Sequence, residues 1–204
     1  MKNNIIIIIV ICFYNMSWAI DSSLIKCLQQ NGNIKANFVQ KVTSGNKTSV
    51  TRGQVIISRP NKFKWIYTVD SKQMVISNGK EVYIYDPDLN QVIIKHLFQL
   101  INQSPAAVLA GSNDLSISYD VHYLGSKNSY IYYKLTAKKS VDNNGFSYIV
   151  LVFDKNQQIK QMTLLDTFNN QIEIIFSNVS YDIGDYKFYF KIPKGVDVIN
   201  ETKQ

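Results

Sequence analysis

The chain has 204 residues, and its 22 lysines and arginines against 15 aspartates and glutamates give a formal net charge of +7. Its basic residues are scattered along the sequence, whereas a nucleic-acid-binding protein normally gathers them on one face. The composition therefore argues against nucleic-acid binding. A scattered positive charge keeps a protein soluble and also attracts it weakly to anionic lipid head groups.

The N-terminus has the three parts of a secretory signal peptide. Lys2 supplies the positive charge, an apolar run follows over residues 5–13, and small residues flank Trp18 before a cleavage point after Ala19. The apolar run is shorter than the roughly 20 residues that a spanning helix needs. We therefore predict that residues 1–19 are a signal peptide and that residues 20–204 form one soluble, extracytoplasmic domain.

The two cysteines predict neither a lipid anchor nor a disulfide. Cys12 lies within the apolar run and follows Ile11, where a lipoprotein signal requires a small residue. Cleavage after Ala19 would leave only Cys27, and one thiol cannot close an internal disulfide. The stability of the domain must therefore come from its hydrophobic core, which at about 185 residues buries roughly 70% of the surface of the unfolded chain.

After a short amphipathic helix capped by Ser22 and Ser23, the pattern is that of β-strands. Phe63, Trp65 and Tyr67 alternate with Lys62, Lys64 and Ile66, and this period of two is typical of half-buried antiparallel strands. Turn signals such as Asn78-Gly79 separate the strands. The predicted strands are 34–43, 53–58, 62–67, 73–77, 81–85, 91–95, 115–123, 130–136, 148–154, 159–165, 171–178 and 186–191.

About eleven or twelve strands in one domain predict a mainly β fold with a strongly coiled sheet or barrel, because open sheets rarely exceed ten strands without curling. One region departs from this pattern. Leu97, Leu100 and Ile101 have helical spacing, and Ser104-Pro105 is a helix start before residues 106–110. These two short helices either plug one end of a barrel as ordinary core or form a movable cover.

No catalytic, metal-binding or nucleotide-binding motif is found in the sequence. The only histidines, His96 and His122, have no partner at metal-ligand spacing, and the aspartates such as Asp86 and Asp154 lie in turn sequences. We therefore predict that the protein is not an enzyme and uses no cofactor or metal. Arg52 and Arg59 are the only arginines, and a guanidinium can bind several carbonyl groups at once, which an ammonium does less well.

Several motifs, in their order and spacing, resemble the periplasmic outer-membrane lipoprotein carrier family, LolA. The resemblance covers essentially all of the chain that follows the signal peptide. It departs from the family pattern at Ala137-Lys138-Lys139 and in the asparagine-rich stretch 142–145. The motifs are Ala36-Asn37-Phe38-Val39-Gln40-Lys41, Arg59-Pro60-Asn61-Lys62-Phe63-Lys64-Trp65, Ser77-Asn78-Gly79-Lys80, Tyr85-Asp86-Pro87-Asp88-Leu89-Asn90-Gln91-Val92, Ser104-Pro105-Ala106 with Leu109, and Pro193-Lys194-Gly195-Val196-Asp197-Val198-Ile199.

The resemblance implies an unclosed antiparallel β-barrel of about 11 strands, with a short N-terminal helix and a helical lid over an apolar cavity. It implies a monomeric chaperone that accepts acylated lipoproteins from an inner-membrane ABC transporter of the LolCDE kind and delivers them to a LolB-like outer-membrane receptor. Arg59 matches the family's latch arginine, which holds the lid closed by bonding lid carbonyls.

We expect one set of apolar residues to line the cavity, with ordinary core packing as the alternative for each of them. Two other functions compete with the carrier function. The outer-membrane receptor shares the fold but is itself a lipoprotein, and a periplasmic sensor or binding module would hold a different hydrophobic ligand. The expected lining residues are Phe63, Trp65, Tyr67, Met74, Ile76, Ile84, Leu97, Leu100, Val108 and Leu109.

Overall fold

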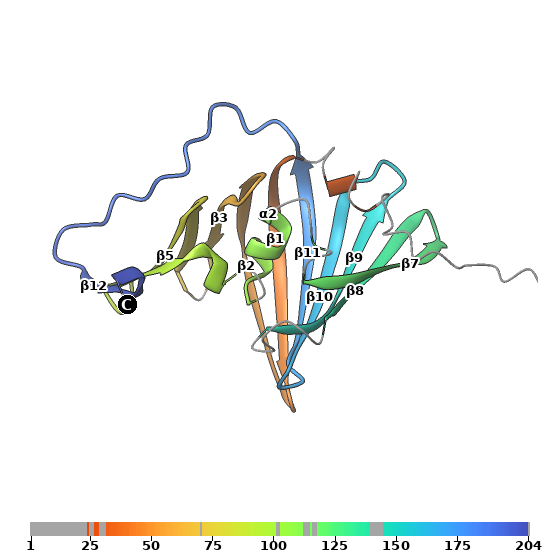
Figure 1. The fold of residues 1–204 in the computed structure, drawn as a ribbon, viewed down its shortest axis with the longest axis horizontal. Helices are drawn as coiled ribbons and strands as arrows, with labels where there is room; N and C mark the ends of the chain where they lie inside the picture. Colours follow the sequence, from red (N-terminus) through yellow and green to blue (C-terminus); the bar gives the residue numbers. More distant parts are fainter. Residues whose placement is uncertain are drawn as a thin grey trace, which may run out of the picture.

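The computed structural model describes Leu24, Cys27, Leu28, Leu115 and residues 32–69, 71–100, 103–111, 118–138 and 145–203. Its strands form one twelve-stranded sheet (Figure 1). The strands are β1 (Asn33–Ser44), β2 (Lys47–Ser58), β3 (Lys62–Tyr67), β4 (Met74–Asn78), β5 (Glu81–Asp86), β6 (Gln91–His96), β7 (Tyr119–Lys127), β8 (Tyr130–Ala137), β9 (Phe146–Asp154), β10 (Ile159–Asp166), β11 (Gln171–Ser180) and β12 (Asp197–Asn200).

The strand order is β12-β6-β5-β4-β3-β2-β1-β11-β10-β9-β8-β7. Hairpins connect sequence neighbours, and pairing of β1 with β11 joins the two halves of the chain. All pairs are antiparallel except β12 with β6, which is parallel. Because β12 and β7 lie at opposite ends of this order, the sheet does not close, and the prediction of an unclosed, mainly β fold is confirmed.

Turn chemistry explains why the hairpins bend where the sequence predicts. The side-chain oxygen of Asn78 accepts hydrogen bonds of 2.9 Å from the backbone N–H groups of Lys80 and Glu81. Gly79 takes a φ of +99°, which a residue without Cβ adopts at little cost. In the next hairpin, Asp86 accepts bonds from the N–H groups of Asp88 and Leu89 in the same way. These local bonds compete with strand pairing and end it.

The helices are short. The structure has α2 (Pro105–Ala110) and the 3₁₀ helices η1 (Leu97–Gln99) and η3 (Glu201–Lys203). Leu24, Cys27 and Leu28 are helical and buried, as expected for the apolar side of the N-terminal helix. None of the helices in the described part of the chain has the length and apolar character needed to cross a bilayer. The predicted signal peptide lies outside the described residues.

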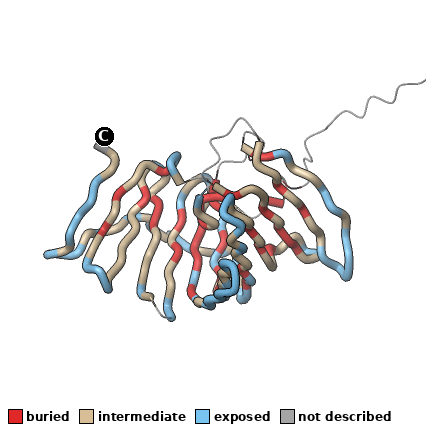
Figure 2. The backbone as a smooth tube through the Cα atoms, turned by 90° about the horizontal axis from the view of Figure 1, so that it is seen from below, coloured by how far each residue is buried: buried red, intermediate tan, exposed pale blue. Residues whose placement is uncertain are grey.

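The two faces of the sheet bury different clusters. We call the face that carries Phe63 and Trp65 the inner face, and α2 packs on it together with the main hydrophobic core. The opposite, outer face buries a second set of residues in β2, β4 and β6. Figure 2 shows how buried and less buried positions are distributed along the strands. These outer-face residues are Ile56, Ile76, Val92 and Ile94.

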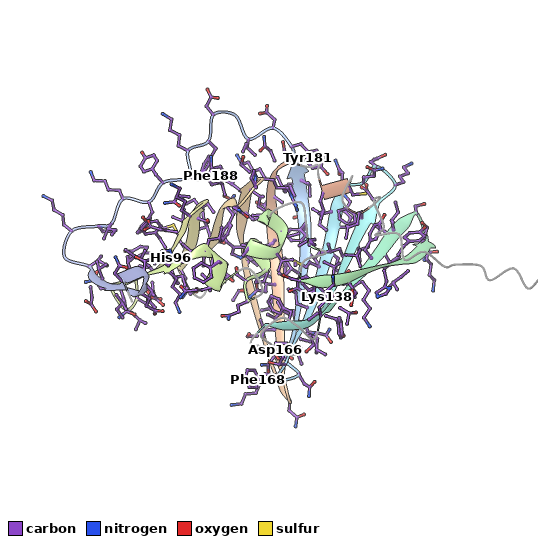
Figure 3. The ribbon with its side chains drawn as sticks, viewed as in Figure 1. His96, Lys138, Asp166, Phe168, Tyr181 and Phe188 are labelled. Atoms are coloured by element: carbon purple, nitrogen blue, oxygen red, sulfur yellow. The ribbon has the colours of Figure 1, made fainter. Side chains whose placement is uncertain are left out.

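The segment from Tyr181 to Val196 runs past the outer face between β11 and β12 (Figures 1 and 3). The sequence predicts a strand at 186–191, and this prediction is wrong: the segment is extended but pairs with no strand. Its alternation has another cause, because every second side chain packs inward, as Phe190 does against Tyr83 and Tyr85 at 5.8 and 5.6 Å. The predicted strand 115–123 also begins later, at Tyr119.

Candidate functional site

The floor of the candidate site is the inner face of β3. Alternation places Phe63, Trp65 and Tyr67 on this face, where Phe63 is 0% exposed, Trp65 is 2% exposed and Tyr67 is half-buried. Ile84 of β5 joins the same face because it pairs with Val75, which pairs with Trp65. Together with Val75, these residues form one apolar surface across β3, β4 and β5.

Gly53 of β2 allows this aromatic surface to continue into β1. It lies between Phe38 and Tyr67 in the register, and a Cβ at this position would lie 2.6 Å from the Phe38 ring and would collide with the backbone oxygen of Ile66. The Phe38 ring occupies that space. Its centroid lies 4.4 Å from that of Trp65 and 5.6 Å, edge to face, from that of Tyr67.

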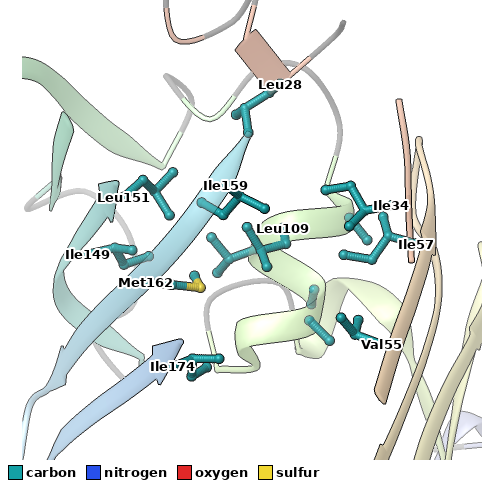
Figure 4. Packing of buried hydrophobic residues seen from close by; sticks show 14 of the residues in the cluster. Leu28, Ile34, Val55, Ile57, Leu109, Ile149, Leu151, Ile159, Met162 and Ile174 are labelled. Atoms are coloured by element: carbon teal, nitrogen blue, oxygen red, sulfur yellow. The ribbon is translucent and has the colours of Figure 1, made fainter. Parts of the chain in front are cut away.

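Helix α2 fills the space above this floor. All residues from Ala106 to Ala110 are at most 2% exposed, and Val108 and Leu109 belong to the core. Leu109 lies between Ile57 of β2 and Met162 of β10 (Figure 4). Of the two roles weighed for the helices, this conformation shows core packing, and a lid over an open cavity is not confirmed.

The other predicted helical residues lie at the margin of the same core. Leu97 in η1 is buried, and Leu100, which follows η1, packs partly buried against the cluster. The backbone N–H of Leu97 donates to Lys80 O at 2.9 Å, which ties η1 to the β4–β5 hairpin. Leu97, Leu100, Val108 and Leu109 therefore lie in one cluster with the residues of β3.

Met74 and Ile76 do not share this surface, and their assignment to the cavity is corrected. Residues that pair directly in antiparallel strands point to the same face. Ile76 pairs with Lys64, and Met74 pairs with Ile66, so both lie on the outer face. The inner-face residues of β4 are instead Val75 and Ser77. The error arose because residues 74–76 are all apolar, so that alternation in this strand does not distinguish its faces.

The sequence reasoning missed the opposite wall of the interior, which the second half of the chain supplies. These side chains are fully buried in the same cluster as α2. Their signal was present as alternating apolar positions in the predicted strands, but no motif marked them as part of the site. The main residues of this wall are Ile149, Leu151, Phe153, Met162, Leu164 and Ile174.

Arg59 lies at the boundary of the interior, just after β2. Its backbone N–H donates to Gly32 O at 2.7 Å, and the N–H of Asn61 donates to Ala110 O, at the end of α2, at 2.6 Å. Asn61 O also accepts a bond of 2.7 Å from the Ser77 hydroxyl. The turn that carries Arg59 is thus fixed to the N-terminal segment, to α2 and to β4.

The guanidinium group of Arg59 does not bond the lid in this conformation. Its Nε, Nη1 and Nη2 atoms are all buried, and none has a hydrogen-bond partner in the described part of the chain. Burial lowers the pKa of Arg59 to about 10, so the group remains charged near neutral pH. Contact between this turn and α2 is made by the backbone of Asn61 instead.

Two phenols, those of Tyr119 and Tyr67, are among the other polar groups of the interior. Burial raises the pKa of Tyr119 to about 12, and its hydroxyl is buried without a partner among the described residues. Burial likewise raises the pKa of Tyr67, whose hydroxyl donates to Gln40 Oε1 at 3.4 Å. No three acidic, histidine or cysteine side chains gather as a metal site in the described ranges. Most of the side chains buried in the interior are apolar.

Comparison with known proteins identifies the same family along most of the chain. The family model described as "Outer membrane lipoprotein carrier protein LolA" matches residues 29–191. A protein of Chromobacterium violaceum called outer-membrane lipoprotein carrier protein is 37% identical over 82% of this chain and 81% of its own length. One of the same name from Francisella philomiragia is 33% identical over 100% of both chains.

Solved structures show likeness in fold. A crystal structure of an uncharacterized conserved protein from Thermus thermophilus matches with a TM-score of 0.55 at 13% identity, over 88% of this chain and 98% of that one. At this identity the match supports the architecture of the sheet alone.

Proposed function

From the premise that this chain belongs to the outer membrane lipoprotein carrier protein LolA family, we propose how it carries its cargo. The protein is a periplasmic chaperone for lipoproteins. It accepts them at the inner membrane from an ABC transporter and delivers them to an outer-membrane receptor. The acyl chains take the place of α2 on the aromatic inner face during this transfer.

One observation supports the proposal most directly: apolar side chains from both halves of the sheet surround α2. Exposing acyl chains to water costs about 0.8 kcal/mol for each CH₂ group. A carrier must therefore cover much of that surface. Helix α2 has only six residues, so its displacement breaks few backbone bonds while it uncovers Phe63 and Trp65.

The receptor function is less well supported. A receptor would itself carry a lipid on an N-terminal cysteine. In the described part of the chain the only cysteine is Cys27, and it is buried in the core. Measuring the mass of the processed protein tests this point. An acylated N-terminal cysteine would show that the protein is the receptor and not the carrier.

The proposed function is tested by mixing the purified protein with inner-membrane spheroplasts. We expect lipoproteins to appear in the soluble fraction in complex with the protein, and to leave it when receptor-bearing outer membranes are added. If no lipoprotein enters the soluble fraction, the carrier function is wrong and a module for another hydrophobic ligand takes its place.

We further propose that Arg59 is a latch for α2. The last carbonyl groups of a helix have no partner within the helix, and the turn of Arg59 already contacts α2 through Asn61 and Ala110. In a second closed state, different from the conformation described above, the guanidinium would bond these carbonyls. Opening α2 would then cost these bonds, which lowers the affinity for cargo and assists release.

For Arg59→Leu we expect normal loading and impaired delivery, because a lid without this opening cost leaves the cargo more tightly bound. Each charge-assisted bond contributes roughly 1.5 to 3 kcal/mol, so loss of one shifts the binding constant about tenfold or more. The measurement is the fraction of lipoprotein passed from the loaded carrier to outer membranes. Arg52→Leu, which changes the other, exposed arginine, is the control. Unchanged delivery by Arg59→Leu would remove the latch from the mechanism.

A further inference from the structure

The guanidinium of Arg59 is buried and has no hydrogen-bond partner among the described residues, which destabilises the fold. A buried donor without an acceptor is destabilising, and more so when it is charged. The backbone around it is held by the three bonds to Gly32, Ala110 and Ser77, so the group can move only by rotation about its own side-chain torsions. Native proteins satisfy most buried donors, and exceptions of this kind point to a role in function.

The position of Arg59 relative to the interior determines which groups of a ligand its guanidinium can contact. Two residues earlier, Ile57 is fully buried on the inner face, whereas Pro60, the next residue, is exposed. Arg59 therefore lies at the rim of the inner face, beside the exposed Pro60, and its guanidinium is buried there.

A lipid whose tails occupy the interior would place its first polar atoms at this rim. In an acylated lipoprotein these atoms are ester and amide carbonyl oxygens, which accept hydrogen bonds and carry no charge. A planar group of five N–H donors can bond two or three such oxygens at once. A neutral acceptor also avoids the cost of bringing a second charge out of water.

We propose that Arg59 binds the ester and amide carbonyl oxygens at the head of the acyl chains; this inference rests on the proposed carrier function. The same donors then serve two acceptors in turn: carbonyls of α2 in the closed carrier and carbonyls of the cargo in the loaded one. When a lipid enters with its carbonyl oxygens next to Arg59, the guanidinium bonds these oxygens in place of the α2 carbonyls. Opening of α2 therefore depends on the head group of the lipid as well as on its tails.

The test compares two lipids with equal tails, dioctanoylglycerol and its dioctyl ether analogue, which lacks the carbonyl oxygens. Binding is followed by the fluorescence of Trp65, which lies on the inner face. We expect the wild-type protein to bind the ester about tenfold more tightly than the ether. Arg59→Met should bring the ratio of the two affinities close to one, and Arg52→Met should leave it unchanged.

The ratio of the ester and ether affinities distinguishes this contact with the lipid from the effect of the latch on α2. A lower cost of opening α2 would strengthen the binding of both lipids equally and leave the ratio unchanged. Arg59→Lys, which keeps the charge but loses the planar fork, should give a reduced ratio, and it decides the question if Arg59→Met does not fold. A wild-type ratio near one, or a ratio that survives both substitutions, overturns the inference and leaves the carrier function standing. Failure of the wild type to bind either lipid contradicts both.

Discussion

Phe63→Glu is expected to lower the free energy of unfolding by more than about 5 kcal/mol and to abolish the loading of lipoprotein. Phe63 is 0% exposed beneath α2. Removal of a buried phenylalanine costs about 3–5 kcal/mol, and an unpaired carboxylate in its place adds several more. Because small proteins have only about 5–15 kcal/mol of stability, most of this margin is lost. Urea unfolding followed by circular dichroism measures the change.

Phe168→Glu is the matched control for this substitution. Phe168 lies at the tip of the β10–β11 hairpin and is 82% exposed (Figure 3). Surface substitutions of this kind change stability by about 0.5 kcal/mol or less. If Phe63→Glu unfolds at the same urea concentration as the wild type, the inner face is open to water and the packed interior described above is wrong.

Much of the fold followed from the sequence because its local signals agree with one another. The alternation in β3 and the turn residues Asn78-Gly79 each define a strand and its end without help from the rest of the chain. The same period of two failed at 186–191, since an extended segment that packs alternate side chains against a sheet has the pattern of a strand. Whether its N–H groups pair with a neighbour is a non-local property.

The candidate site was predicted only in part, for a related reason. Phe63, Trp65 and Tyr67 alternate with Lys62, Lys64 and Ile66, and the two lysines identify their face, whereas Met74 and Ile76 lie in an apolar run that covers both faces. The packing of α2 against Met162 and Ile174 depends on the pairing of β1 with β11, which no local motif encodes.

A disulfide between α2 and the turn of Arg59 should switch loading off reversibly. The backbones of residues 61 and 110 meet at a hydrogen bond of 2.6 Å, and both residues have buried side-chain atoms. Disulfides require Cα atoms about 4.4–6.8 Å apart. We expect oxidised Asn61→Cys/Ala110→Cys, in a Cys27→Ala background, to accept no lipoprotein in the spheroplast assay, and the reduced form to accept it.

Each single-cysteine variant serves as a control for the loss of the native side chain. Asn61 has a φ of +68°, so cysteine at this position costs of the order of 1 kcal/mol in both redox states. Only the crosslink differs between them. Equal loading by the oxidised and reduced forms would show that α2 remains in the core during transport.

Contact between acyl chains and Trp65 tests the account most directly. Trp18 lies in the predicted signal peptide, so Trp65 is the only tryptophan of a chain that begins at residue 20. Lipids brominated on the acyl chain quench tryptophan fluorescence on contact. We predict strong quenching by a bound brominated diacyl lipid and none by its unbrominated form. Stoichiometric binding of the brominated lipid without quenching would mean that the tails occupy some other surface.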